Sequence, residues 1–310
     1  MPVSQTGSCE PSPRTADTLA RAEHRPEAAR ARLHAGLVAL VLLVILGVLY
    51  QVIIRDLVWQ WWDDDNYSHG FLVPLLSGFL IWRRRSDLMA VVPQGSWAGL
   101  VLLVAGIVAL IIGDVGAENF LTRSSLIVIL AGLVLFHLGR DALRVVLFPL
   151  AFLFFMIPLP AILFYAVTLP LQGLAAQNSV WALDLLGVPV LRDGNVIQLS
   201  QISLGVAEAC SGIRSLISLL ALAVARAYLT LPGTWPMIVL VASAVPITIV
   251  ANAGRVVGTA LIGQWLGVQY ALGFFHTFSG WLIFLLAFVC LLGVHRLIRL
   301  VPVGRRGKNA

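Results

Sequence analysis

The stretch "LVALVLLVILGVLYQVII", residues 37–54, decides the class of fold, because it runs for eighteen residues without a charge. A helix needs roughly 20 apolar residues to cross a hydrocarbon core about 30 Å thick. Further apolar stretches of 13 to 22 residues follow, and the chain is 59% hydrophobic and only 12% charged, with a mean hydropathy of +0.92. Such a composition leaves too little polar surface to cover a soluble globule of 310 residues. The sequence therefore predicts an all-α polytopic membrane protein.

Polar segments flank this membrane domain on both sides. Residues 1–32 are rich in Pro, Ala, Arg and Glu, so we expect a disordered cytoplasmic tail there. The multi-span domain is expected over residues 33–300, and residues 301–310 form a basic cytoplasmic tail. The polar leader is too long for a cleavable signal peptide and no small-residue cleavage site follows, so residues 37–54 are expected to remain as the first span.

The distribution of basic residues predicts the orientation, because Lys and Arg near helix ends stay on the cytoplasmic side. Most of them form five groups: Arg14, Arg21, Arg25, Arg30 and Arg32; Arg83, Arg84 and Arg85; Arg140 and Arg144; Arg226; and Arg296, Arg299, Arg305, Arg306 and Lys308. The connections between these groups carry the acidic residues Asp56, Asp63, Asp64, Asp65, Asp114, Glu118, Asp184, Asp193 and Glu208. We therefore expect both termini inside and the acidic connections outside.

A threading with about eight spans, an even number, places both termini on the same side of the membrane. Several of these spans are short for the bilayer. The expected spans are residues 35–57, 67–82, 97–113, 124–138, 143–160, 211–229, 235–254 and 277–298. Between the fifth and sixth spans, residues 161–187 suit a helix lying at the outer interface. The β-branched residues and turn formers of "RDGNVIQLSQISLGV", residues 192–206, predict a short hairpin just before the next span.

Cys210 lies in "VAEACSGIRS", residues 206–215, where this outward segment enters a span. Arg214 follows one helical turn later, and both this cation and the helix N-terminus lower the pKa of the thiol. Cys9 belongs to the tail on the other side, and Cys290 lies mid-span, where a cysteine is usually a small buried hydrophobic residue. A free thiol that faces an oxidising compartment is a liability unless it is used.

Two further polar groups are expected at the same outer level. Arg255, with Asn252, closes a span in "VANAGRVVG", residues 250–258, and His276 opens the next in "GFFHTFSGW", residues 273–281. Arg255 could instead be an interfacial anchor, and His276 could be structural. His69, in "DDDNYSHGFLVP", has a similar outward placing and is the rival histidine.

The elements "EACSGIRS", "NAGR", "GFFH" followed by "SGW", and the early "DNYSHGFLVPLLSGFLIWRRR" resemble the exosortase family over residues 35–300. The resemblance implies a membrane-embedded cysteine transpeptidase whose substrates end in a PEP-CTERM-like tail, which consists of a short motif, a transmembrane helix and an Arg-rich end. It implies Cys210, Arg255 and His276 as the catalytic set. Supporting residues would be Arg214, Glu208, Asn252, Ser211 and Gly212, and substrate-facing residues would be His69, Asp65 and Tyr67. No metal-ligand spacing appears, and no cofactor is expected.

Such an enzyme would lie in a bacterial inner membrane with its active site near the periplasmic face. Its partners would be the lipid bilayer, membrane-anchored substrates with sorting tails and an acceptor nucleophile, but no nucleic acid. A transporter or channel is the main alternative, although it would place acidic residues at mid-span depth and show repeat symmetry, and the sequence has neither feature. A non-catalytic component of polysaccharide export is the third interpretation.

Overall fold

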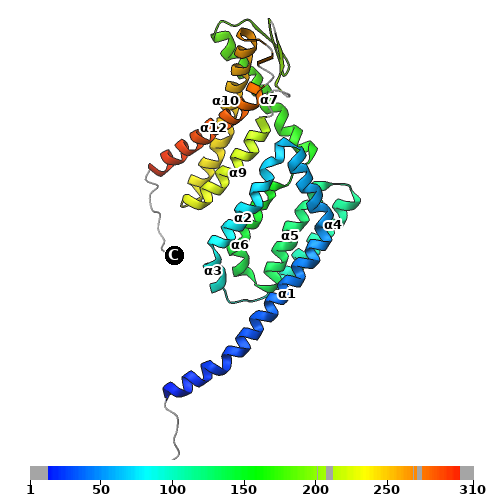
Figure 1. The fold of residues 1–310 in the computed structure, drawn as a ribbon, viewed down its shortest axis with the longest axis vertical. Coiled ribbons are helices and arrows are strands. Elements are labelled where there is room, and N and C mark those ends of the chain that lie inside the picture. Colours follow the sequence, from blue (N-terminus) through cyan, green and yellow to red (C-terminus); the bar gives the residue numbers. More distant parts are fainter. Residues whose placement is uncertain (1–12, 201, 207–211, 268, 271–273, 301–310) are drawn as a thin grey trace, which may run out of the picture. The chain divides into compact units, whose positions relative to one another are not determined.

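The computed structural model describes residues 13–200, 202–206, 212–267, 269–270 and 274–300 (Figure 1). These residues form helices and one small sheet, and the chain divides into two units, Met1–Arg55 and Asp56–Ala310. The first helix, α1 (Pro13–Asp63), begins in the first unit and ends in the second. Residues 13–32 have a helical backbone where composition predicts disorder. Ala, Arg and Glu are strong helix formers, which favours the helix locally.

Six of the described helices are long and apolar enough to cross a membrane. They are α1 over Leu40–Asp63, α4 (Ala98–Val115), α5 (Asn119–His137), α9 (Gly212–Thr230), α10 (Thr234–Trp265) and α12 (Phe274–Leu300). A bent pair, Arg140–Met156 with Ala161–Leu185, adds a seventh candidate if its 76° bend lies within one span. The protein is therefore an all-α multi-pass membrane protein, as predicted, but the count of eight spans is not confirmed.

Two expected spans account for the difference. Residues 67–82 contain a 3-10 helix, η1 (Asp65–Phe71), and the helix α2 (Leu72–Arg83), whose 12 residues reach only about 18 Å. The short α3 (Arg85–Ala90) follows. Residues 143–160 begin in α6 (Arg140–Phe152) and continue as a 3-10 turn, η2 (Leu153–Met156). Pro158 and Pro160 come next in the chain, and because proline lacks the N–H that a helix interior needs, the span breaks there.

The segment after this break contains a helix and a sheet. The predicted helix is present as α7 (Ala161–Leu185). The predicted hairpin is part of a three-stranded antiparallel sheet in the order β1 (Val190–Asp193), β2 (Val196–Leu199) and β3 (Ser203–Gly205). Gly194, with φ +59°, supplies the left-handed conformation that the two-residue turn between β1 and β2 requires.

Side chains of the sheet pack onto the neighbouring helices. Ile197 and Leu204 are buried in one apolar cluster with Ala176 of α7 and with Val256 and Ala260 of α10. A sheet of strands this short, three or four residues each, is marginal without such support. The sheet is thus fixed to the α10 turn that carries Arg255.

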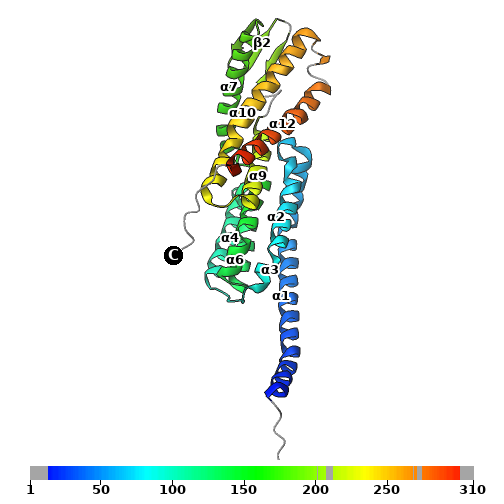
Figure 2. The ribbon, with the colours of Figure 1, turned by 90° about the vertical axis from the view of Figure 1, so that its left-hand side faces the viewer.

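Helix α10 packs against both α9 and α12, whereas α9 and α12 contact each other much less (Figure 2). At one end of this group, the Thr230 hydroxyl lies 2.8 Å from Nε2 of His295. At the same end of α9, the Arg84 guanidinium lies 5.2 Å from the centre of the Tyr228 ring. The end of α2, the end of α9 and the C-terminal part of α12 therefore lie near one another.

Helices α4 and α5 form a closely packed pair. Gly99, Gly106 and Gly113 recur every seven residues along α4 and are all buried. A Cβ atom on these glycines would collide in turn with Phe136, Ile129 and Thr122 of α5. Because glycine lacks this atom, the two helix backbones approach closely.

Candidate active site

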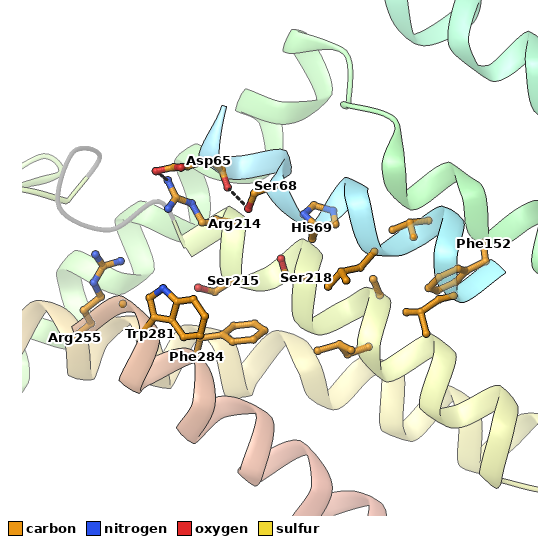
Figure 3. Close-up of a pocket in the computed structure, with 16 residues that line it drawn as sticks. Asp65, Ser68, His69, Phe152, Arg214, Ser215, Ser218, Arg255, Trp281 and Phe284 are labelled. Atoms are coloured by element: carbon orange, nitrogen blue, oxygen red, sulfur yellow. Dashed lines mark hydrogen bonds and ion pairs between the residues drawn. The ribbon is translucent and has the colours of Figure 1, made fainter. Parts of the chain in front are cut away.

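A cavity of about 750 Å³ lies between η1, α2, α6, α9, α10 and α12 (Figure 3). Its polar lining residues are Asp65, Ser68, His69, Arg214, Ser215, Ser218 and Arg255, and its other lining residues are Leu72, Val73, Leu76, Phe152, Ala221, Leu222, Gly280, Trp281 and Phe284. In Figure 3, Arg255 and Phe152 lie at opposite ends of the cavity. The cavity thus runs from a cationic end to an apolar end.

Arg214 points from the first turn of α9 toward η1. Its Nη2 atom forms an ion pair with Oδ2 of Asp65 at 3.1 Å (Figure 3). Both side chains are substantially exposed, so the pair contributes little to folding stability. It does hold the guanidinium at the cavity wall, and it joins two segments that lie 149 residues apart in the sequence.

Ring N–H groups join the end of α1 and η1 to the 3-10 turn η2. Nε1 of Trp61 donates to the Met156 carbonyl at 2.9 Å, and Nε2 of His69 lies 3.1 Å from the Phe155 carbonyl. Because a carbonyl oxygen only accepts, Nε2 of His69 must carry the hydrogen, so Nδ1 bears the lone pair of the neutral ring. Burial lowers the pKa of His69, and the hydrogen bond to the Phe155 carbonyl offsets this in part. The ring is therefore neutral at pH 7.

Tyr67 does not face the cavity, contrary to the prediction that it faces substrate. It is 5% exposed and packs in an apolar cluster with Leu57, Trp61 and Val73. Burial raises the pKa of its phenol. Successive residues of the 3-10 helix lie on different sides of it. Asp65, Ser68 and His69 therefore line the cavity, and Tyr67 packs in the core.

Arg255 and Asn252 project from the middle of α10 at helical spacing i and i+3. Arg255 is half-buried and lines the cavity, and a Cβ atom on Gly280 of α12 would lie 3.4 Å from its Nη2. Asn252 is 8% exposed, and a Cβ atom on Gly212 of α9 would lie 2.9 Å from its Nδ2. This part of α10 therefore contacts the beginnings of both α9 and α12.

Three predicted site residues, Glu208, Cys210 and Ser211, lie outside the described residues. The backbone of His276 belongs to the first turn of α12, whereas its side chain is not among the described ones. Cys290 is exposed on α12 rather than buried, at a mid-span position that lipid would cover.

Sequence reasoning missed several residues of the cavity. Ser215 and Ser218 place two hydroxyls on the face of α9 that Arg214 begins, and Trp281 and Phe284 supply the wall from α12 (Figure 3). The serine spacing was a usable signal, because hydroxyls at i and i+3 in an apolar helix mark one face. The aromatic residues carried no such signal, since many aromatic residues line membrane helices.

The described residues contain no group of three His, Cys, Asp or Glu side chains that could hold a metal ion. What the cavity offers instead is two guanidinium groups, a neutral imidazole and hydroxyls beside an apolar compartment. Such a site can bind and polarise a carbonyl group at the border of an apolar segment.

The family model of the transmembrane exosortase family (Exosortase_EpsH) matches residues 61–293. No curated protein and no solved structure matches the chain. The matched region contains the whole cavity, from Asp65 of η1 to Phe284 of α12. The chain belongs to the transmembrane exosortase family.

Proposed function

We propose that this transmembrane exosortase is a cysteine peptidase or transpeptidase that removes the C-terminal sorting tail of secreted proteins. The observation that carries the proposal is the cavity. Its polar end is lined by Arg214, four residues after Cys210, and by Arg255, and its other end is apolar. A PEP-CTERM-like tail has the same order of properties, because a polar motif directly precedes its transmembrane helix.

The reaction begins when His276 takes the proton of the Cys210 thiol, and the resulting thiolate attacks the scissile carbonyl carbon, since the thiolate and not the thiol is the nucleophile. The tetrahedral intermediate collapses, the C–N bond breaks, and His276 returns the thiol proton to the leaving amine. The product is a thioester between Cys210 and the substrate. An amine or hydroxyl acceptor then releases the chain by transpeptidation, or water releases it by hydrolysis, and the thiol is restored.

Arg255 stabilises the developing oxyanion in this scheme. It is half-buried, and a cation placed in advance in a partly dehydrated site contributes more than it would in water. Arg214 is paired with Asp65 and lies one helical turn after Cys210. Its position on the same helix face as Cys210 assigns it to the lowering of the thiol pKa.

The cavity is sized for the junction of motif and helix rather than for a whole helix. A helix about 10 Å across with a 5.4 Å pitch occupies roughly 420 Å³ per turn. The volume of about 750 Å³ thus holds less than two turns. The rest of the substrate helix would lie in lipid beside α2 and α12, and the membrane itself would position the motif.

The proposed location is a bacterial inner membrane, with the termini inside and the cavity near the periplasmic face. Single cysteines placed at Asp64, Asp193 and Gln269 are expected to react with an impermeant maleimide in intact cells. Those placed at Arg84 and Gly304 are expected to react only after permeabilisation. Labelling of the Arg84 and Asp193 positions from the same side would contradict this topology.

A transporter is the alternative class of membrane protein. Ionisable groups along a proton or solute path lie at intermediate depth in the bilayer. The charged groups of this cavity, Asp65, Arg214 and Arg255, lie instead toward one end (Figure 3). This distribution favours the peptidase.

The decisive experiment replaces each cysteine in turn. Cys210→Ala, expressed at normal level, is expected to abolish removal of the tail from a co-expressed reporter that ends in a Pro-containing motif, an apolar helix and an Arg cluster. Cys9→Ala and Cys290→Ala are the matched controls and should process the reporter normally. Full-length reporter would accumulate in the membrane and migrate more slowly on a gel. Normal processing by Cys210→Ala would end the cysteine-enzyme hypothesis.

A further inference from the structure

We infer that the outer edge of β3 binds the scissile segment of the substrate as an added antiparallel or parallel strand. The inference rests on the proposed function, because it identifies how that substrate is held. Strand order β1-β2-β3 places β3 at the edge of the sheet. Its residues 203–205 end five positions before Cys210. Five residues reach at most about 18 Å, so the edge cannot be remote from the thiol.

The hydrogen-bonding pattern shows which backbone groups of β3 are turned outward. The Leu199 N–H donates to the Ile202 carbonyl, and the Val206 N–H donates to the Asn195 carbonyl, both at 2.9 Å. Hydrogen-bonded pairs alternate along an antiparallel ladder. The pair between these two is therefore Ile197 with Leu204, as the register confirms.

It follows that the N–H and C=O of Leu204 point toward β2 and bond to it. The backbone groups of its two neighbours, Ser203 and Gly205, point away from β2. The outward groups are the N–H and C=O of Ser203 and the N–H of Gly205. Within the described part of the chain, no strand lies on that side of β3. Ser203 is exposed, and an open edge of this kind is a template for another extended chain.

The position of this edge relative to Arg255 favours a substrate. Leu204 is 2% exposed and packs in one cluster with Val256, the residue after Arg255. The face of β3 that carries the Leu204 side chain thus packs against the turn of α10 that carries Arg255, the proposed oxyanion group. A strand added at the usual spacing of about 4.8 Å would run beside that turn.

An extended peptide fits the requirements of this site. Main-chain hydrogen bonds give affinity that does not depend on side chains, and pockets for alternate side chains give selectivity. A motif held as a strand also presents its carbonyl groups in a fixed register, as attack on one bond requires. We therefore assign the edge to the sorting motif and the cavity to the first turns of the substrate helix.

Proline substitution tests the edge directly. Ser203→Pro removes an N–H that points away from β2, so it breaks no hydrogen bond of the sheet. Sheets tolerate proline at such edge positions. The same alternation turns the N–H of Arg192 outward on β1, at the opposite edge, so Arg192→Pro is the matched control. We expect Ser203→Pro to slow reporter conversion in a pulse-chase about tenfold or more. Arg192→Pro should remain close to wild type.

The readouts separate this inference from the proposed function. Processing at the wild-type rate by Ser203→Pro, with Cys210→Ala inactive, would overturn the edge and leave the peptidase intact. Processing by Cys210→Ala would remove both. Alkylation of Cys210 by iodoacetamide at the wild-type rate in Ser203→Pro would show that the proline has not disrupted the neighbouring site.

Disulfide trapping provides a test that does not depend on turnover. In the Cys210→Ala protein, Ser203→Cys is combined with a cysteine scanned through the motif of the reporter. A docked strand predicts cross-links that alternate with a period of two residues. Uniform or absent cross-linking would contradict it. Substrate-independent linking of two Ser203→Cys chains would assign the edge to a second copy instead and would overturn the inference.

Discussion

The α4–α5 pair and the cavity region use glycine in opposite ways. On α4, Gly99, Gly106 and Gly113 face the backbone or branched side chains of α5. Glycine there allows the two helices to approach closely. In the cavity region, Gly212 and Gly280 face the side-chain ends of Asn252 and Arg255, so glycine there makes space for polar groups.

The difference separates residues that maintain the fold from residues that serve the site. A contact with backbone cannot relax without moving a helix, whereas a contact with the end of a side chain can. Substitutions in α4 should therefore reduce stability, and those around the cavity should reduce activity.

The largest effect is expected for Arg255→Lys. The variant keeps the charge but loses the forked donor geometry of the guanidinium, and removing one oxyanion donor costs about 10² to 10³ in rate, or roughly 3 to 4 kcal/mol. We expect normal insertion and melting temperature with severely slowed reporter conversion in a pulse-chase at matched enzyme level. An interfacial anchor would behave otherwise, because Lys snorkels as well as Arg. Near wild-type conversion would make Arg255 an anchor and leave Arg214 as the candidate cation.

Next in size is Gly99→Ala on α4. The new Cβ atom would meet the backbone nitrogen and Cα of Phe136, so α4 and α5 must separate, at a cost of about 1–3 kcal/mol. The expected result is a lower yield of folded protein and a lower melting temperature in detergent. Gly258→Ala on α10 is the control, because nothing lies within 4 Å of the position that its new methyl group would take and Ala favours helix. Equal melting temperatures for the two variants would remove the proposed role of the α4 glycines.

A smaller and different effect is expected for Gly212→Ala. Its methyl group would press on the Asn252 amide, which can rotate away, so stability should change by less than about 1 kcal/mol. Because Asn252 lies one turn from Arg255, we expect conversion to fall several-fold while the melting temperature stays unchanged. A drop in melting temperature as large as that of Gly99→Ala would place Gly212 with the structural glycines.

The smallest effect concerns the pH dependence of stability. Burial lowers the pKa of His69 below its unfolded value of about 6.5, so the unfolded chain takes up the proton first. The contribution of His69 is complete above about pH 6.5 and is lost as pH falls below that value toward the folded pKa. His69→Gln should flatten the fall in melting temperature between about pH 6.5 and more acidic values. An identical slope in the variant would show that His69 is not the group responsible.

The sequence by itself determined the class of the fold and the polar residues worth testing. Long uncharged stretches such as residues 37–54 specify membrane helices, because transfer of apolar side chains into lipid depends on composition over about 20 residues. The same local logic predicted a helix over residues 161–187 and extended strands after it. It also singled out Cys210, Arg255 and His276, with Arg214 as a supporting residue and His69 as the rival histidine, since charges and imidazoles are costly near a membrane unless they are used.

Only the tertiary structure decided which of these elements span and which residues meet. The break after α6, the 12-residue length of α2 and the third strand depend on prolines and pairing partners that hydropathy does not register. The ion pair between Asp65 and Arg214 and the burial of Tyr67 likewise follow from how η1 packs. Contacts between segments far apart in sequence are set by the packing of whole helices, and no window of local sequence contains that information.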